Sequence, residues 1–205
     1  MAGFTAIAAV GKSIERLLAQ AFVERQPVPT KTAKVVLIRT EDLDGNGIKN
    51  LVGDIGLTIL LYRVDFNKTM RAAWAARAED DGRGHLALDL HFLLTPWADN
   101  ADHQHMNIGS AMQVIERVAM LAGPLLYEPA LPSPAYDDEP RASSIDSVQL
   151  LLEEISTEAL MRTFDSLPGD YHLCVPYVAR VVRIDTLAEI VAPPVIDANI
   201  EMRVN

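Results

Sequence analysis

Alternation between hydrophobic and polar positions predicts two central strands in this chain. Residues 57–66 begin apolar on both faces, a pattern typical of a strand in the middle of a sheet. Residues 86–95 alternate most clearly, with the period of two that a strand requires. One of their faces carries Leu86, Leu88, Leu90, Phe92 and Leu94, and the other carries Ala87, Asp89, His91, Leu93 and Thr95. We therefore expect the first face to be buried in the core.

Three further strands are expected from apolar runs bounded by turn signals, at residues 34–39, 148–155 and 171–184. Pro176 in the last of these runs indicates a sheet edge or a bulge, because proline cannot donate to a ladder. Residues 41–47 contain two glycines and are predicted to be a turn-rich loop. Residues 124–140 contain five prolines and an acidic run, so they are predicted to be a loop as well.

Hydrophobic spacings of three and four residues predict the helices. Such spacing runs through residues 5–23 and again through residues 100–120. The second helix is expected to bury a stripe made of His105, Ile108, Met112, Ile115 and Ala119. Ser156 or Thr157 is suited to cap a further helix that ends at Pro168. Residues 67–78 are expected to form a short helix or an irregular connection.

The predicted elements follow the order α-β-β-β-α-β-α-β, which indicates an α+β fold of the α/β-sandwich type. We expect a mixed, largely antiparallel sheet in which consecutive strands pair as hairpins and the helices pack on one face. Residues 1–185 are predicted to form one domain. Residues 186–205 are predicted to form an extended C-terminal tail, stiffened by Pro193 and Pro194.

Charge and composition exclude several classes of function. The chain has 205 residues, of which 18 are Lys or Arg and 28 are Asp or Glu, giving a formal net charge of −10. This balance argues against binding to nucleic acid or to an anionic membrane. No segment reaches the roughly 20 apolar residues that a membrane span needs. The N-terminal segment does not read as a secretory signal, so we expect synthesis in the cytoplasm. The single Cys174 lies among apolar residues, which favours an inert thiol.

Residues 42–47 resemble the first half of an EF-hand calcium loop. Asp42, Asp44 and Asn46 occupy the first, third and fifth ligand positions, and Gly47 occupies the sixth. The bidentate glutamate due at the twelfth position is missing, because Gly53 stands there. We therefore interpret the segment as a glycine-containing loop, with a calcium-binding module at residues 42–47 kept as an alternative.

A second alternative is a small metal-dependent hydrolase that uses residues 99–105. Asp99 lies four residues before His103, so the two side chains are neighbours on a helix. His103 and His105 point to different faces, however, and a metal site on one helix needs histidines four residues apart. We expect His105 to be a hydrogen-bonded, partly buried side chain. The sequence contains no nucleophile or nucleotide-binding motif.

Several segments, taken in order along the chain, resemble one protein family. LTILLYRVDFNK at residues 57–68 resembles a hallmark strand of the cap, or tail-terminator, proteins of phage-tail-like contractile injection systems. Residues 86–113 resemble the next hallmark, through Leu88, Asp89, Leu90, His91, Leu93, Leu94, Thr95, Trp97, Ala98, His105, Gly109, Ala111 and Met112. Residues 148–185 resemble the C-terminal strand, helix and strand of the family, although Phe164 replaces a tryptophan and Cys174 a serine.

The resemblance implies a structural protein, without enzymatic activity or a cofactor. It implies a fold similar to phage tail terminators and a hexameric ring that ends the inner tube and the contractile sheath. The implied partners are five further copies of the chain, the sheath protein and the tube protein, with no nucleic acid and no direct membrane insertion. We expect assembly in the cytoplasm, into a particle that stays in the cell or is released.

Two groups of residues are candidates for partner binding. Asp89 and His91 lie on the strand face opposite the expected core, where a role at a subunit boundary would explain them. Ile200, Met202 and Val204 alternate with polar residues in the tail, which is a strand pattern. A terminal strand of this kind can add to the edge of a neighbouring cap or sheath subunit.

Overall fold

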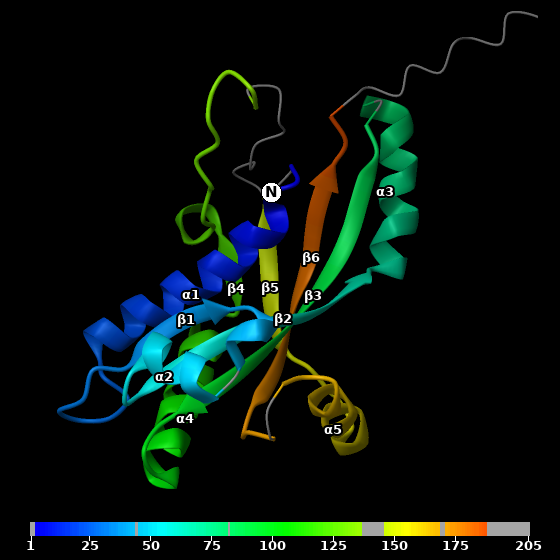
Figure 1. The fold of residues 1–205 in the computed structure, drawn as a ribbon. Coiled ribbons are helices and arrows are strands. Elements are labelled where there is room, and N and C mark those ends of the chain that lie inside the picture. Colours follow the sequence, from blue (N-terminus) through cyan, green and yellow to red (C-terminus); the bar gives the residue numbers. More distant parts are fainter. Residues whose placement is uncertain (1–2, 44, 82, 137–145, 169–170, 188–205) are drawn as a thin grey trace, which may run out of the picture.

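The computed structural model describes residues 3–43, 45–81, 83–136, 146–168 and 171–187. Its six-stranded mixed sheet has the strand order β1-β2-β3-β6-β5-β4 (Figure 1). The strands are β1 (Lys34–Ile38), β2 (Gly56–Phe66), β3 (His85–Trp97), β4 (Met120–Ala122), β5 (Ser147–Leu152) and β6 (Val175–Asp185). The α+β class and the central position of β2 are confirmed. Strand β4, which is only three residues long, was not expected from the sequence.

The β1–β2 pair is parallel, whereas the sequence predicted antiparallel hairpins between consecutive strands. The reason lies in residues 41–47, where the predicted loop is wrong. A 3₁₀-helix (Thr40–Leu43) and helix α2 (Gly45–Val52) return the chain to the end of the sheet where β1 begins, so β2 runs in the same direction as β1. Parallel strands need such a crossover. A side chain at Gly56 would clash with Val52, because an added Cβ would lie 2.4 Å from the valine Cβ.

Strand β6 lies inside the sheet, between β3 and β5, so the expectation of an edge strand from Pro176 is wrong. The ladder between β5 and β6 extends only to the pair Leu152 and Tyr177, so it does not include Pro176, which precedes Tyr177. Beyond it, the Pro176 carbonyl still accepts a hydrogen bond from the Glu153 amide at 3.0 Å. The register shift between β3 and β6 falls at Leu88 and Leu90, away from Pro176.

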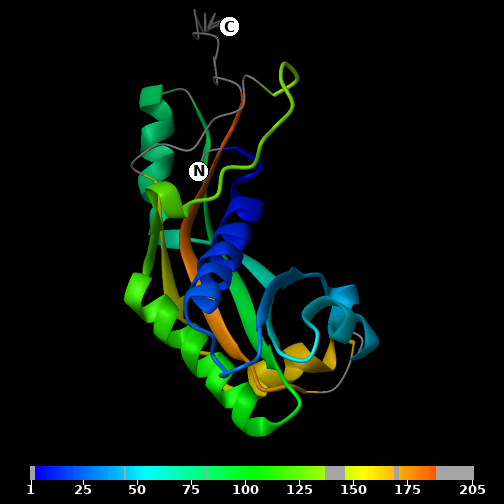
Figure 2. The ribbon, with the colours of Figure 1, turned by 90° about the vertical axis from the view of Figure 1, so that its left-hand side faces the viewer.

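Helices cover both faces of the sheet, so the expectation that they pack on one face is also wrong. Helices α1 (Ala6–Glu24) and α4 (Ala101–Val118) pack over the larger core, which includes Leu90 and Leu94. Helices α2 and α5 (Thr157–Asp165) enclose a smaller cluster that includes Leu93. Figure 2 shows α4, in green, and α5, in yellow-orange, on opposite sides of the strands. The predicted alternation along β3 is therefore confirmed.

Helix α4 buries part of the predicted stripe. Its inward face is centred on Ile108, Ala111 and Ile115, and it also buries Asn107, whose side-chain amide donates to the Gly56 carbonyl at 2.6 Å. His105 lies to one side of this face and is exposed, so its predicted core position is wrong. Ile108 and Ile115 are buried as predicted, and Met112 packs against the core. The periodicity therefore located the helix and much of its inward face but wrongly included His105.

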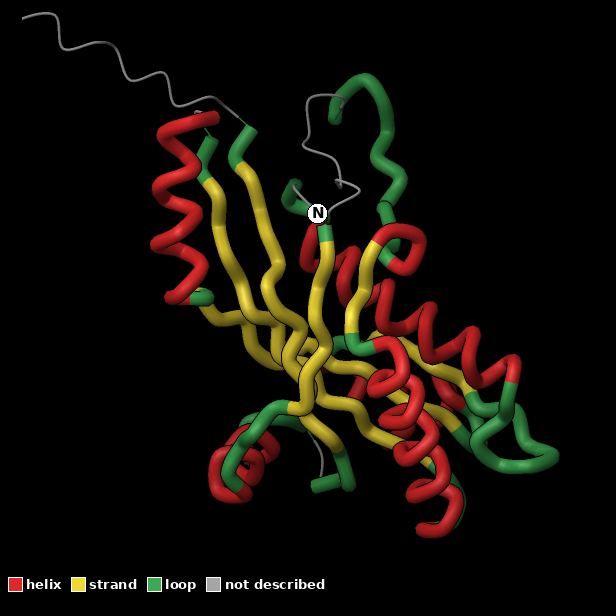
Figure 3. Tube along the Cα trace, turned by 180° about the vertical axis from the view of Figure 1, so that it is seen from behind, coloured by secondary structure: helices red, strands yellow, loops and turns green. Residues whose placement is uncertain are grey.

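Helix α3 (Lys68–Asp81) stands beside one end of β3 (Figure 3). Its start is capped by Asn67, whose side-chain oxygen accepts from the Met70 amide at 2.9 Å. A second 3₁₀-helix (Gly123–Leu125) follows β4. Among the described residues, no helix is long and apolar enough to cross a membrane.

Candidate functional site

A network of polar side chains lies on the sheet between the smaller cluster and α3. It joins residues from β2 and β3 with the residue that directly follows β5. The Arg63 guanidinium donates to Glu153 Oε1 at 2.8 Å and to Asp65 Oδ2 at 2.9 Å. The Tyr62 hydroxyl donates to Glu153 Oε2 at 2.8 Å. Both carboxylate oxygens of Glu153 are therefore hydrogen-bonded within the chain.

His91 lies inside this network, and its imidazole has two acidic neighbours. Its Nδ1 lies 2.9 Å from Glu153 Oε1, and its Nε2 lies 3.3 Å from Asp65 Oδ2. Arg63 Nη2 lies 3.1 Å from the same Nδ1. Because Nδ1 donates when it carries the proton, its bond to Glu153 and a bond from Arg63 exclude each other.

Burial strengthens the contact between Tyr62 and Glu153. The pKa of Tyr62 is raised well above its usual range, first by burial of the phenol and then by its hydrogen bond to the Glu153 carboxylate. The side chains of His91 and Glu153 are only 8% and 11% exposed. A nearly buried carboxylate requires such partners, since an unpaired one would be costly. The network therefore joins three strands that are not all neighbours in the sheet.

Asp89 forms a second polar contact on the same face of β3. Its carboxylate accepts both hydrogen bonds from the Asn67 amide, at 3.0 and 3.2 Å. Because Asn67 caps α3, Asp89 fixes the position at which that helix begins. Both sequence candidates on this strand, Asp89 and His91, thus have partners within the chain. Their role at a subunit boundary stays a prediction, and Ile200, Met202 and Val204 lie outside the described residues.

Sequence reasoning missed Tyr62, Arg63 and Glu153 as members of the site. The signal was present in part, since Arg63 interrupts the apolar strand at residues 57–66 and Glu153 follows the apolar end of β5. Nothing in the sequence indicates that these positions meet, because 90 residues separate Arg63 from Glu153.

A shallow hollow of about 370 Å³ opens on the sheet between α3 and β4. Met70 and Trp74 of α3 form one wall, while Met120, Gln149 and Arg180 contribute from the strands. The residues next to two of these positions, Leu121 and Leu150, are buried in the larger core. The hollow therefore lies on the opposite face of β4 and β5, which α1 leaves uncovered.

Asp42, the first ligand of the alternative calcium site, is hydrogen-bonded to Arg39. The Asp42 carboxylate accepts from the Arg39 guanidinium at 3.1 and 3.3 Å and from the Arg39 amide at 2.9 Å. These bonds lower the pKa of Asp42. Gly53, at the position where an EF-hand has its glutamate, has a φ of 71° and ends α2. The side chains of Asp44 and Asn46 lie outside the described residues.

Of the residues proposed for a metal-dependent hydrolase, only Asp99 and His103 are in contact in the described part of the chain, and Asp99 also pairs with Lys31. Asp99 lies 2.9 Å from His103 Nδ1, as the spacing predicted, and 2.8 Å from the Lys31 ammonium. The Lys31 bond, followed by the His103 bond, lowers the pKa of Asp99 to about 2. His105 takes no part in this contact. Within the part of the chain that the structure describes, no three His, Cys, Asp or Glu side chains gather in a group suited to a metal ion.

Cys174 directly precedes β6 and is buried in the smaller cluster. Burial raises the pKa of its thiol to about 11. Because the thiolate is the reactive form, the prediction of a buried, inert cysteine is supported by this geometry.

The chain's fold is similar to that of a solved contractile-system protein. The relevant cryo-EM structure is described as the sheath/tube terminator, in the extended state, of an extracellular contractile injection system named PVC. The two chains are 16% identical and superpose with a TM-score of 0.51. The match covers 88% of this chain and 56% of that one, so this chain spans little more than half of the terminator's length. A likeness at this identity shows the fold.

Family membership rests on a separate comparison. No curated protein matches this chain. The family model described as the Pvc16 N-terminal domain matches residues 9–198, which is most of the sequence. The resemblance noted in three segments of the sequence is thereby confirmed, and the chain belongs to the Pvc16 N-terminal domain family.

Proposed function

We propose that this chain is a terminator of the sheath and inner tube in a phage-tail-like contractile injection system, and that it acts as a hexameric ring. Membership in the Pvc16 N-terminal domain family supports the proposal. So does the fold shared with a chain described as a sheath/tube terminator. The sheath protein, the tube protein and further copies of this chain are the proposed partners.

The observation that carries the proposal is where the family-like segments lie in the fold. Residues 57–66 and 86–97 lie in the central strand pair, and their polar members Tyr62, Arg63 and His91 meet in one network with Glu153. These residues stabilise the sheet through mutual hydrogen bonds. A structural role of this kind requires no catalytic residue, no cofactor and no metal.

A ring of this chain places physical demands on its partners. Each subunit must offer two different surfaces that meet at a rotation which closes the ring. Six copies would multiply the formal charge of −10, so the tube and sheath should present basic or mixed surfaces. Asp89 and His91 are proposed to support a subunit boundary by fixing the start of α3 and the sheet beside it.

The C-terminal tail is proposed to be a strand-exchange arm. Residues 1–185 would form the terminator domain, and residues 186–205 would leave it. Ile200, Met202 and Val204 would face the acceptor, because they alternate with polar residues. Synthesis and assembly are proposed to take place in the cytoplasm, within a particle that remains in the cell or is released.

The test is to observe the purified chain by mass measurement and electron microscopy, alone and with tube protein. We expect rings with six-fold symmetry, and tubes that stop growing at one end when the chain is present. Tube protein polymerised without the chain is the control, since its tubes should reach greater lengths. A monodisperse monomer under both conditions, with tube lengths unchanged, would contradict the proposal.

A further inference from the structure

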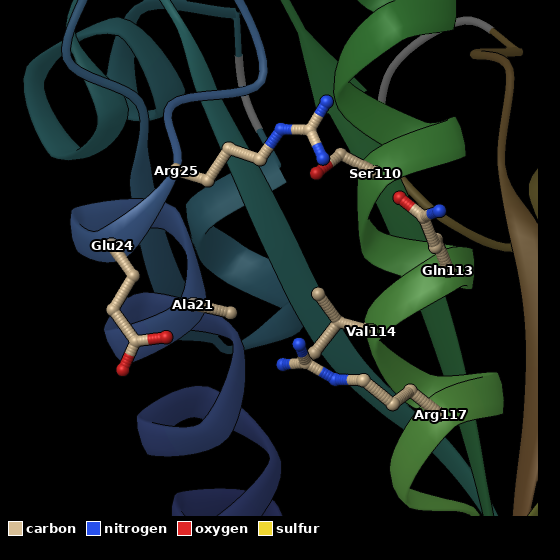
Figure 4. Close-up of a pocket in the computed structure, with 7 residues that line it drawn as sticks. All are labelled: Ala21, Glu24, Arg25, Ser110, Gln113, Val114 and Arg117. Carbon is tan, nitrogen blue, oxygen red and sulfur yellow. The ribbon is translucent and has the colours of Figure 1, made fainter.

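A groove of about 350 Å³ lies between the end of α1 and the second half of α4, away from the polar network (Figure 4). Ala21 and Val114 provide its apolar lining. Ser110 and Gln113 add a hydroxyl and an amide from α4. The groove therefore combines a small apolar floor with neutral hydrogen-bonding groups.

Two arginines give the groove a positive charge. Arg25 extends from the end of α1 toward Ser110, and Arg117 extends from α4 back toward α1 (Figure 4). Neither guanidinium forms an ion pair or a side-chain hydrogen bond with any of the residues the structure describes. The acid in the lining, Glu24, accepts from Gln20 at 3.1 Å, and its carboxylate points away from Arg25 in Figure 4.

Several arginines of this acidic chain have a carboxylate partner. Arg39, Arg63, Arg162 and Arg183 each lie within 4 Å of a carboxylate. Arg25 and Arg117 instead project into one groove from opposite walls. An anion that enters the groove is attracted by both charges.

We propose that this groove docks an acidic segment of a partner protein, whose carboxylates pair with Arg25 and Arg117. Guanidinium and carboxylate groups form bidentate, charge-assisted hydrogen bonds. The apolar floor suits the methylene groups of a glutamate side chain, and Gln113 can donate a further hydrogen bond. A nucleic acid is disfavoured because its long run of phosphates would meet the net negative charge of the chain. This inference does not depend on the proposed function, because it requires only that the partner segment carry carboxylates.

The test measures binding of fluorescein-labelled hexaglutamate by anisotropy at low ionic strength. The variant Arg25→Gln/Arg117→Gln should bind at least about tenfold more weakly than the parent, because both charge-assisted contacts are lost. Arg71→Gln/Arg162→Gln is the matched control. It removes two exposed arginines from α3 and α5, leaves the same net charge, and should bind within about twofold of the parent. Salt should weaken binding to the parent and the control.

A second variant tests the groove without removing either arginine. Gln113→Glu places a carboxylate in the lining of the groove, on the helix that carries Arg117, and should weaken hexaglutamate binding by repelling its carboxylates. Equal losses in the groove variant and the matched control would overturn the proposal, as would absence of binding to the parent. Tighter binding of tripolyphosphate or single-stranded DNA than of hexaglutamate would also overturn it, in favour of a phosphate site. Melting curves of all variants should match the parent, because every substituted side chain lies at the surface.

Discussion

Arg63 and Glu153 form an ion pair with a 2.8 Å contact, although β3 and β6 lie between the strands that carry them. Glu153 directly follows β5, and its side chain reaches over the sheet to β2. His91 of β3 lies beneath this contact, with its Nδ1 2.9 Å from the same carboxylate. The pair thus connects β2 with the end of β5, two strands that share no backbone ladder with each other.

This connection predicts a measurable coupling between the two residues. Glu153→Gln should lower the free energy of unfolding by roughly 1–2 kcal/mol, because the carboxylate is nearly buried and accepts from Arg63 and Tyr62. A double-mutant cycle with Arg63→Gln should give a coupling of roughly 1 kcal/mol, reduced by the partial exposure of Arg63. Denaturant unfolding of the four proteins measures it.

The pair Glu158 and Arg162 on α5 is the matched control for this cycle. Its contact is equally short, at 2.7 Å, but both side chains are largely exposed. The same two glutamine substitutions there should give a coupling below about 0.5 kcal/mol. If the two cycles return equal couplings, the network on the sheet contributes no more than a surface ion pair.

The buried face of β3 gives a second prediction. Leu90 is fully buried in the larger core, so Leu90→Asp places a carboxylate where no partner or water can reach it. We expect a loss of at least about 4 kcal/mol, comparable with the total stability of many domains. Leu152→Asp, at a side chain that is 57% exposed, should change the melting temperature little. Parent-like melting of Leu90→Asp would refute the assignment of this face.

Sequence patterns located the long strands β2, β3 and β6, and the alternation along β3 separates its two buried faces. The pattern did not place β6 inside the sheet. Helix α2 escaped prediction since Gly45 and Gly47 are typical of turns, and only Ile48 and Val52 face the core. A segment this short has its structure decided by packing against the sheet. The parallel pairing of β1 depended on that missed helix.

The site was predicted only in part, for a different physical reason. Asp89 and His91 were identifiable because a charged residue and a histidine alternate with leucines. Their partners Asn67 and Glu153 come from other elements, and only the strand order brings them near. His105 shows the converse error, since a helical stripe fixes the spacing of buried residues but leaves the rotation of the helix to tertiary packing.

The contact between Lys31 and Asp99 predicts a pH dependence at acid pH. The pKa of Asp99 is lowered from 3.8 to about 2, so its charged form is favoured by folding. Its contribution to stability is therefore present above the unfolded value of 3.8 and is lost as the pH falls toward 2. Lys31→Ala should raise the pKa of Asp99, as measured by an NMR pH titration. Lys68→Ala is the control. Lys68 follows the end of β2 that lies far from Asp99, so this change should leave the pKa of Asp99 unchanged.

The C-terminal tail gives the final prediction. The hydrogen bonds of the last strand extend slightly beyond the predicted boundary, because Thr186 and Gly84 exchange two of them, at 2.9 and 3.0 Å. A deletion that tests the tail should therefore begin at residue 188. We expect the shortened chain to melt within about 2 °C of the parent, since the residues of the larger core all precede residue 188.

The same deletion should abolish sheath retention if the tail is a strand-exchange arm. Ladder hydrogen bonds supply much of the affinity of an added strand, so their loss cannot be offset by side-chain contacts elsewhere. Sedimentation of sheath with capped tubes measures retention. Ile200→Asp/Met202→Asp/Val204→Asp in the full chain is the companion variant, because it keeps the tail but removes its apolar face. Normal retention by both proteins would remove the tail from assembly, and unfolding of the shortened chain would assign the tail to the domain itself.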